Sequence, residues 1–140
     1  MPATAVAGYS GTPLVKKLGV KEGQRVAWLG APDGFDALVG ELPPGVTVLR
    51  RLSAPLDVLV QFTTSRVDLQ RRLPRLRDAV FPAGAAWIAW PKRASGVPTD
   101  VTEDVVREVA LPRGWVDVKV CAIDATWSGL KLVVPKAQRT

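Results

Sequence analysis

The sequence places polar side chains directly after its short apolar runs, where they could bind or orient a ligand. They are Asp33 after RVAWL, Thr63 after DVLVQF, Lys92 and Ser95 after AAWIAW, and Asp124 and Trp127 in the segment DATWSG. The chain has no histidine, so a carboxylate or a lysine would have to carry any proton transfer. Lys92 beside Asp33 or Asp124 would form either an ordinary ion pair or a pair that orients a ligand.

Residue types that bind metals or form disulfides are scarce. Without histidine the commonest transition-metal ligand is missing, so we expect no metal site. Cys121 is the only cysteine, which excludes an internal disulfide. It alternates with Asp117 and Lys119 on one face of a predicted strand. Lys119 could lower the pKa of the thiol, but an inert packing role is the simpler interpretation.

Two places in the sequence could hold an anion. Arg50 and Arg51 end the run VTVL and could receive a phosphate, as an arginine does at the equivalent place in folds that bind NADP. Paired arginines at a strand end can also simply be solvated. The segment from Gly8 to Gly11 leads into a short helix with Lys16 and Lys17, so it predicts either a capped helix or an anion cradle.

Basic charge is concentrated in one predicted helix. Nineteen Lys and Arg against thirteen Asp and Glu give a net charge of +6. Apolar residues recur at helical spacing from Leu69 to Val80, so the arginines between them face solvent. These arginines are Arg66, Arg71, Arg72, Arg75 and Arg77. No aromatic side chain lies among them to stack on bases, so we expect only weak, non-specific association with nucleic acid.

The remaining pattern predicts the elements that position these side chains. Strands are expected at 25–29, 46–49, 57–62, 85–90, 115–123 and 130–134, of which those at 25–29 and 85–90 are predicted to be buried. Helices are expected at 12–18, 35–42 and 67–80, and a fourth that is capped by Asp100 or Thr102 and ends near Ala110. Pro74 would kink the third helix or open a second one. The loop RRLSAPL is too short for a helix. The chain therefore predicts a three-layer, Rossmann-like α/β fold with a mostly parallel six-stranded sheet and a C-terminal antiparallel hairpin.

We expect a single domain over residues 1–140. It comprises an N-terminal loop and short helix over 1–24, the sheet and helices over 25–134, and a tail over 135–140. The beginning of the sequence has no charged, apolar leader, and no apolar stretch is long enough to span a bilayer. We therefore expect a soluble cytoplasmic protein with no membrane partner.

The order of a short helix, K-x-G-x-R-V, a strand, L-G-x-x-x-G and a terminal hairpin resembles the class I methyltransferase architecture over nearly the whole chain. The segment LGVKEGQRVAWLGAPDG resembles the entry to the cofactor site of that family. The stretches AGYSGTPL, LGAPDGF, WPKRASGVPTD and VCAIDATWSGLKLVV also resemble a family of small bacterial proteins that carries no assigned activity.

Three residues depart from the methyltransferase pattern at the cofactor site. Trp28 stands where an acidic residue is expected, and Pro32 replaces the middle glycine between Gly30 and Gly34. Arg50 ends the second strand, where a carboxylate would bind the ribose hydroxyls. On these grounds the indole and the pyrrolidine ring would occupy the space of the cofactor. We therefore expect no cofactor, and in particular no S-adenosylmethionine.

The sequence thus predicts a non-catalytic, methyltransferase-like binding or interaction module with an unknown protein or small-molecule partner. Its candidate ligand rim consists of Gly30, Asp33, Gly34, Thr63, Lys92, Ser95, Asp124 and Trp127. One alternative is a small-molecule transferase or nucleotide-binding enzyme that uses Asp33, Asp124 and Lys92 around Trp127. Another is weak nucleic-acid association through the arginine-rich helix.

Overall fold

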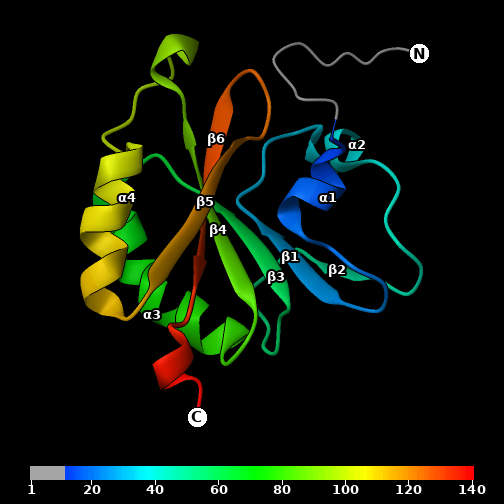
Figure 1. Ribbon diagram of the computed structural model, residues 1–140. Helices are drawn as coiled ribbons and strands as arrows, with labels where there is room; N and C mark the ends of the chain where they lie inside the picture. The colour runs from blue at the N-terminus through cyan, green and yellow to red at the C-terminus, as the bar shows by residue number, and fades with distance from the viewer. Residues whose placement is uncertain (1–11) are drawn as a thin grey trace.

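The computed structural model describes residues 12–140 (Figure 1). Its α-helices are α1 (Leu14–Leu18), α2 (Phe35–Val39), α3 (Arg66–Val80) and α4 (Glu103–Ala110). Its strands are β1 (Arg25–Leu29), β2 (Thr47–Leu49), β3 (Val58–Phe62), β4 (Ala85–Pro91), β5 (Val116–Ala122) and β6 (Trp127–Val133). Three short 3-10 turns follow at η1 (Arg93–Ser95), η2 (Leu111–Arg113) and η3 (Lys136–Gln138). The segment from Gly8 to Gly11, a candidate anion cradle, lies outside the described residues.

The strands form one six-stranded mixed sheet in the order β2-β1-β3-β4-β6-β5. The first four are parallel, and β6 runs antiparallel to both β4 and β5. Consequently the carboxyl ends of β1, β3 and β4 meet the start of β6 at one edge of the sheet (Figure 1). The predicted α/β class, the six strands and the antiparallel closing strand are confirmed.

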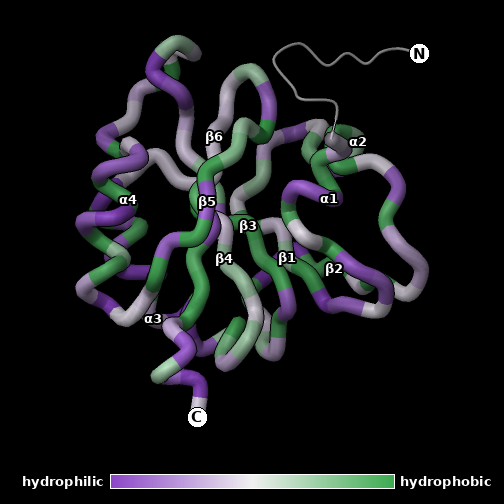
Figure 2. Tube along the Cα trace, viewed as in Figure 1, coloured by the Kyte–Doolittle hydropathy of each residue, from purple (hydrophilic) through white to green (hydrophobic). Residues whose placement is uncertain are grey.

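Each face of the sheet carries its own apolar core. On one face, Leu69 and Leu73 of α3 pack with Leu59 and with α4. On the other, Leu18 of α1 and residues of α2 pack with Trp28 and their neighbours. Every residue of β3 and β4 is buried, which explains why these strands are continuous apolar runs in the sequence. Figure 2 shows this contrast between the hydrophobic central strands and the more hydrophilic outer segments.

Several predicted elements differ in detail. Helix α3 is continuous from Arg66 to Val80 with Pro74 inside it, so Pro74 does not start a second helix. Helix α2 ends at Val39, because Gly40 takes a positive φ. The hairpin loop is shorter than predicted, since Trp127 begins β6. As expected, residues 50–57 contain no helix between β2 and β3. Among residues 12–140, no helix is long and apolar enough to cross a bilayer.

Candidate functional site

The turn after β1 lies directly against the end of β3. Gly30 has φ +65°, a conformation that side-chain-bearing residues rarely adopt. A Cβ atom at this position would lie 3.3 Å from the Phe62 carbonyl oxygen. The turn is closed by the Phe35 N–H, which donates to the Pro32 carbonyl at 3.2 Å. The absence of a side chain at Gly30 therefore lets the two strand ends approach closely and leaves the space above them open.

Three adjoining depressions surround this turn. One of about 380 Å³ is lined by Gly30, Asp33, Gly34 and Asp36 together with their neighbours. A second of about 400 Å³ shares Gly30 and is lined by Phe62, Thr63 and Trp127 among others. A third of about 150 Å³ is lined by residues that include Asp33, Asp124 and Trp127. Because they share these residues, the three form one groove along the sheet edge, which we call the rim groove.

The rim groove brings together six of the eight predicted rim residues. They are Gly30, Asp33, Gly34, Thr63, Asp124 and Trp127. Lys92 and Ser95 line none of these depressions. The Ser95 hydroxyl donates to the Lys92 carbonyl at 2.7 Å and so belongs to the turn after β4. Thr63 is buried, and its hydroxyl contacts the backbone of Ser65, the residue that caps α3.

Lys92 and Asp124 do not form the ion pair that was considered from the sequence. The Lys92 ammonium donates to the backbone carbonyl of Asp124 at 2.7 Å. The Asp124 Oδ1 atom accepts the N–H groups of Thr126 and Trp127, each at 2.8 Å. A short side chain that bonds the backbone two residues on stabilises a tight turn. Both residues therefore fix the β5–β6 turn and with it the position of Trp127.

The indole of Trp28 and the ring of Pro32 do not fill the rim groove, contrary to the steric argument from the sequence. Trp28 is 2% exposed, and its ring stands edge-on to Phe35 with centroids 5.3 Å apart. It points into the core between β1 and α2, because strand residues alternate between the two faces. Pro32 is half-buried and forms part of the wall of two depressions. The groove remains open to a ligand.

Four aromatic rings run from the core to the rim groove. Phe35 contacts Trp28 and Phe62, and Phe62 contacts Trp127 with centroids 5.0 Å apart. All three contacts are edge-to-face, the arrangement that aromatic quadrupoles favour. The ring of Trp127 thus belongs to a packed series and is held in place at the groove wall.

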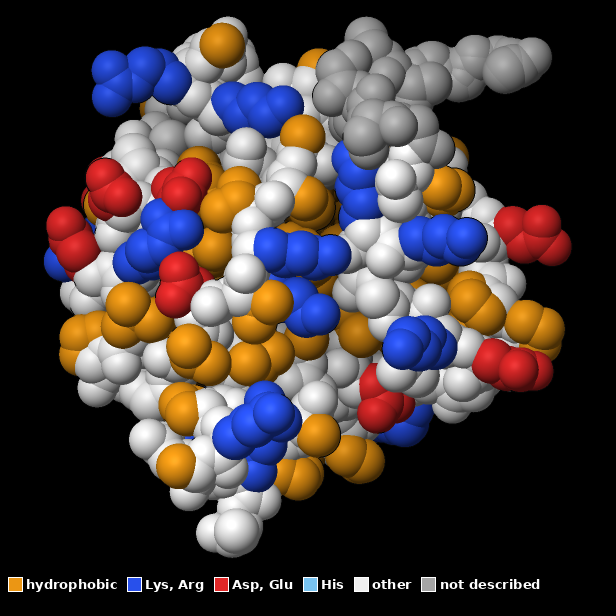
Figure 3. All heavy atoms as spheres, viewed as in Figure 1, with side chains coloured by type: hydrophobic (Ala, Val, Ile, Leu, Met, Phe, Trp, Pro, Cys, Tyr) orange, Lys and Arg blue, Asp and Glu red, His pale blue; other side chains and the backbone are white. Residues whose placement is uncertain are grey.

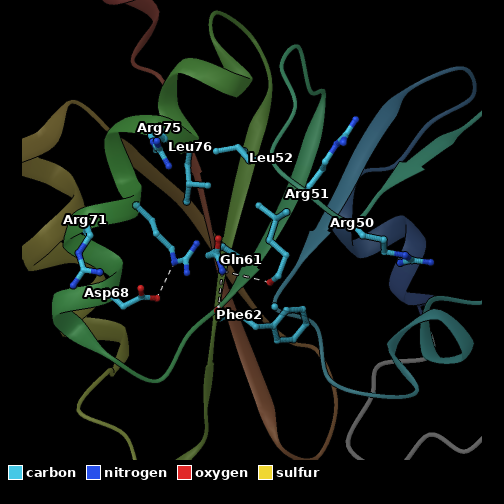
Figure 4. A pocket seen from close by; sticks show the side chains of 12 residues that line it. Arg50, Arg51, Leu52, Gln61, Phe62, Asp68, Arg71, Arg75 and Leu76 are labelled. Atoms are coloured by element: carbon cyan, nitrogen blue, oxygen red, sulfur yellow. Dashed lines mark hydrogen bonds and ion pairs between the residues drawn. The ribbon is translucent and has the colours of Figure 1, made fainter.

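Arg50 and Arg51 end β2 but take different surroundings. Arg50 is held by Asp36, with two N–O distances of 2.9 Å. Arg51 lines a further cavity of about 720 Å³ between β3, the loop after β2, and α3, which adjoins the rim groove at Gly30 and Phe62 (Figure 4). The charged residues that line this cavity, which we call the arginine cavity, are Arg50, Arg51, Asp68, Arg71, Arg72 and Arg75. Arg71, Arg72 and Arg75 of α3, which the sequence predicts to face solvent, therefore line this cavity.

Sequence analysis missed Gln61, which also lines the arginine cavity. It is 3% exposed, and its amide nitrogen donates to the Phe62 carbonyl at 2.9 Å and to the Leu29 carbonyl at 3.4 Å. Its Oε1 atom has no hydrogen-bond partner among the described residues. A polar residue inside the strand VLVQF, buried on both faces, was the available signal.

The thiol of Cys121 lies in a partly buried position on β5. Burial raises the pKa of Cys121 above its usual value, and this effect outweighs the nearby charges of Lys17 and Lys119. The suggestion that Lys119 lowers this pKa is therefore wrong in its net effect.

Figure 3 shows that Lys and Arg side chains on the face it displays are scattered among apolar groups and do not form a continuous patch.

No protein-family model and no curated protein matches the chain. The resemblance to a family of small bacterial proteins therefore rests on the sequence stretches alone. Many solved structures do share the fold. A SAM-dependent methyltransferase from Aquifex aeolicus matches with TM-score 0.63 and 18% identity over 87% of this chain and 88% of that chain. Aeropyrum pernix fibrillarin, with natively bound S-adenosyl-L-methionine, matches with TM-score 0.55 and 15% identity over 90% and 70%.

A third similar structure is an O-methyltransferase from neocarzinostatin biosynthesis, in complex with S-adenosylmethionine and 2-hydroxy-5-methyl naphthoic acid. It matches with TM-score 0.61 and 12% identity over 81% of this chain and 49% of that chain. These comparisons show the methyltransferase-like fold. They contradict the expectation of a non-catalytic module without a cofactor, because two of these three similar structures are methyltransferases and two contain bound S-adenosylmethionine.

Proposed function

We propose that this chain binds S-adenosylmethionine in the rim groove and is a small methyltransferase. The observation that carries this proposal is the open groove above Gly30, whose missing side chain lets the β1 turn approach β3. The sequence stretches LGAPDGF and IDATWSG support it further, because they supply half of the residues that line the groove. The likeness to S-adenosylmethionine-dependent enzymes of the same fold supplies the choice of cofactor.

The residues of the groove suit the chemical groups of this cofactor. The glycine turn from Gly30 to Gly34 would hold its amino-acid end through the backbone. Asp36 would accept hydrogen bonds from the ribose, since this carboxylate lies at the end of β2 through its contact with Arg50. The rings of Phe62 and Trp127 would attract the sulfonium cation. When bound, S-adenosylmethionine supplies an activated methyl group to a nucleophile.

The acceptor's proton would pass to a carboxylate, because the chain has no histidine. Asp124 Oδ1 is already occupied by two backbone N–H groups. Asp33 is exposed, lines two parts of the groove and has no hydrogen bond to another described residue. We therefore assign the proton to a carboxylate oxygen of Asp33, with Trp127 positioning the acceptor.

Isothermal titration calorimetry with S-adenosylmethionine and S-adenosylhomocysteine tests the proposal. We expect both to bind the purified chain, and Gly30→Ala to weaken binding by about tenfold or more, because the added methyl group narrows the turn beside Phe62. Gly96→Ala is the matched control, since Gly96 has φ +76° and open space around it, and it lines none of the three depressions. Absence of heat with both ligands at millimolar concentration, in a chain shown to be folded, would refute the proposal.

A further inference from the structure

The arginine cavity lies between the loop after β2 and helix α3 (Figure 4). Because residues 50–57 form no helix, the sheet beside α3 is covered there only by a loop. The result is a hollow of about 720 Å³, a size typical of sites for small molecules. Its apolar lining consists of Leu29, Leu52, Phe62 and Leu76.

Positive charge dominates the wall of this cavity. Five arginines line it, and the only acidic residue among the lining residues is Asp68. Asp68 already binds Arg72 at 2.8 Å, and Arg50 binds Asp36 outside the cavity. Arg51, Arg71 and Arg75 form no ion pair with a carboxylate among the described residues. The cavity therefore holds like charges together without matching anions, an arrangement that an anionic ligand stabilises.

The arginines come from two different elements. Figure 4 shows Arg51 on the loop after β2 and Arg71 and Arg75 on α3, with Gln61 on the sheet between the two elements. The side chain of Arg51 extends away from α3, and that of Arg71 lies on the far side of the helix. A guanidinium group offers several N–H donors in a planar fork that matches the oxygens of a phosphate. If these long side chains turn toward a bound phosphate chain, the arginines of the two elements can bind it from both sides, which a convex, solvated helix face cannot do.

Gln61 gives a second, independent indication of a ligand. Its amide nitrogen faces two backbone carbonyls, so its Oε1 atom is directed away from them. This buried atom has no partner within the described chain, although buried polar atoms are nearly always hydrogen-bonded. Because Gln61 lines the cavity, a ligand with an N–H or O–H donor beside its phosphates could satisfy this atom if the buried amide shifts toward it.

We propose that the arginine cavity binds a small phosphorylated molecule of the nucleoside diphosphate class. Its phosphates would lie between Arg51 and the arginines of α3. Its base or sugar would rest against Leu52 and Leu76 and supply a hydrogen-bond donor toward Gln61. The arginine cavity shares Gly30 and Phe62 with the rim groove, whereas Arg51, Arg71 and Arg75 line the arginine cavity alone. This proposal does not depend on the methyltransferase activity, because the side chains that would bind the phosphates lie outside the rim groove.

Calorimetric titration with ADP, adenosine and pyrophosphate at physiological ionic strength tests this site. We expect ADP to bind most tightly, pyrophosphate more weakly, and adenosine without phosphate hardly at all. The double variant R51Q/R75Q should weaken ADP binding by about tenfold or more, since each lost charge-assisted hydrogen bond is worth about a tenfold change or greater. Circular dichroism should show an unchanged fold, because both side chains are exposed.

The matched control is R93Q/K136Q, which removes the same charge at exposed positions outside the cavity. It should leave the ADP affinity nearly unchanged. An equal loss in both double variants would overturn the proposal, as it would indicate non-specific attraction to the net positive charge. Equal binding of ADP and adenosine, or no binding of ADP at millimolar concentration, would also overturn it.

Titration of the same variants with S-adenosylmethionine separates the two proposals. R51Q/R75Q should retain the affinity of the unmodified chain for S-adenosylmethionine, if that cofactor binds in the rim groove. A parallel loss of S-adenosylmethionine and ADP binding would refute a separate phosphate site. Failure of S-adenosylmethionine to bind any variant, with ADP binding intact, would refute only the proposed methyltransferase function.

Discussion

Arg50 forms a bidentate ion pair with Asp36, in which each terminal nitrogen lies 2.9 Å from a carboxylate oxygen. This pair joins the end of β2 to the first turn of α2. No sequence pattern predicts this pair, because the two residues lie on different elements. Because Arg50 follows β2, the sequence predicts no carboxylate at the end of this strand. The fold supplies one there from the neighbouring helix.

Replacing Asp36 tests whether this carboxylate serves a ligand or only the fold. Both side chains are more than half exposed, so Asp36→Asn should change the free energy of unfolding by less than about 1 kcal/mol. In the proposed methyltransferase it should nevertheless weaken S-adenosylmethionine binding by about tenfold, through the loss of a hydrogen bond to the ribose. Calorimetry measures the affinity, and Asp104→Asn, on the exposed side of α4, is the control. Unchanged affinity would exclude Asp36 from the cofactor site.

The ring of Trp127 offers a second test, because it packs against Phe62 at the groove wall. Trp127→Ala should lower the free energy of unfolding by about 2 kcal/mol, through the loss of a half-buried aromatic contact. Trp127→Phe keeps an aromatic edge at this place and should cost much less. Urea denaturation compares the two variants. We expect Trp127→Ala to weaken S-adenosylmethionine binding more than Trp127→Phe does. Equal affinity of the two variants would argue against a contribution of the aromatic ring to binding.

The sequence was informative wherever burial repeats with a simple period. The apolar runs of β3 and β4 predicted buried strands, and the leucines of α3 predicted its inward face. These patterns follow from local geometry, which is why the number of strands and their order along the chain could be predicted from the sequence. The placement of Asp33 and Thr63 on one edge followed from the parallel topology, and that of Trp127 from the antiparallel direction of the last strand.

The sequence failed where contacts depend on tertiary structure or on irregular backbone. The predicted alternation in β5 is broken by a register shift between Asp117 and Lys119. Asp117 therefore contacts Arg107 of α4, while Lys119 lies over the ring of Trp87 on the opposite face. The sequence likewise did not indicate the direction of the Trp28 side chain, because the identity of a residue in a buried strand does not determine which face of the sheet it occupies.

Cys121 should be a poor nucleophile. Burial raises the pKa of its thiol, so the thiolate fraction at neutral pH is smaller than that of an ordinary cysteine. We expect alkylation by iodoacetamide to be at least about tenfold slower than for a free thiol, and to accelerate when the chain is unfolded in urea. Mass spectrometry of the modified protein gives the rates. Alkylation of the folded chain at the rate of glutathione would contradict this prediction.

Gly84 connects α3 to β4 at a place where three backbone carbonyls converge. A Cβ atom there would lie 2.6 Å from the Leu56 oxygen, 2.9 Å from that of Val80 and 3.0 Å from that of Asp57. Since backbone cannot easily move aside, Gly84→Ala should lower the free energy of unfolding by about 1–3 kcal/mol. Thermal or urea denaturation checks this, with the exposed neighbour changed by Ala83→Ser as control. Equal stability of the two variants would mean that the junction can open.

The contact between Arg107 and Asp117 should make stability depend on pH in the acid range. The hydrogen bond from Arg107 lowers the pKa of Asp117 below its ordinary 3.8, and Asp117 Oδ2 lies 2.8 Å from Arg107 Nε. A carboxyl group with a lowered pKa in the folded state binds fewer protons there than in the unfolded state. Its contribution to stability is therefore present above the ordinary pKa and is lost as pH falls through the lower, folded value.

Asp117→Asn should accordingly reduce the melting temperature slightly at neutral pH, and the difference from the unmodified chain should disappear in acid. Asp78→Asn, on an exposed position without an ion pair to another described residue, should show no such convergence. Melting curves recorded across the acid range by circular dichroism decide the matter, and a difference that stays constant at low pH would show that Asp117 stabilises the chain by packing and not by its charge.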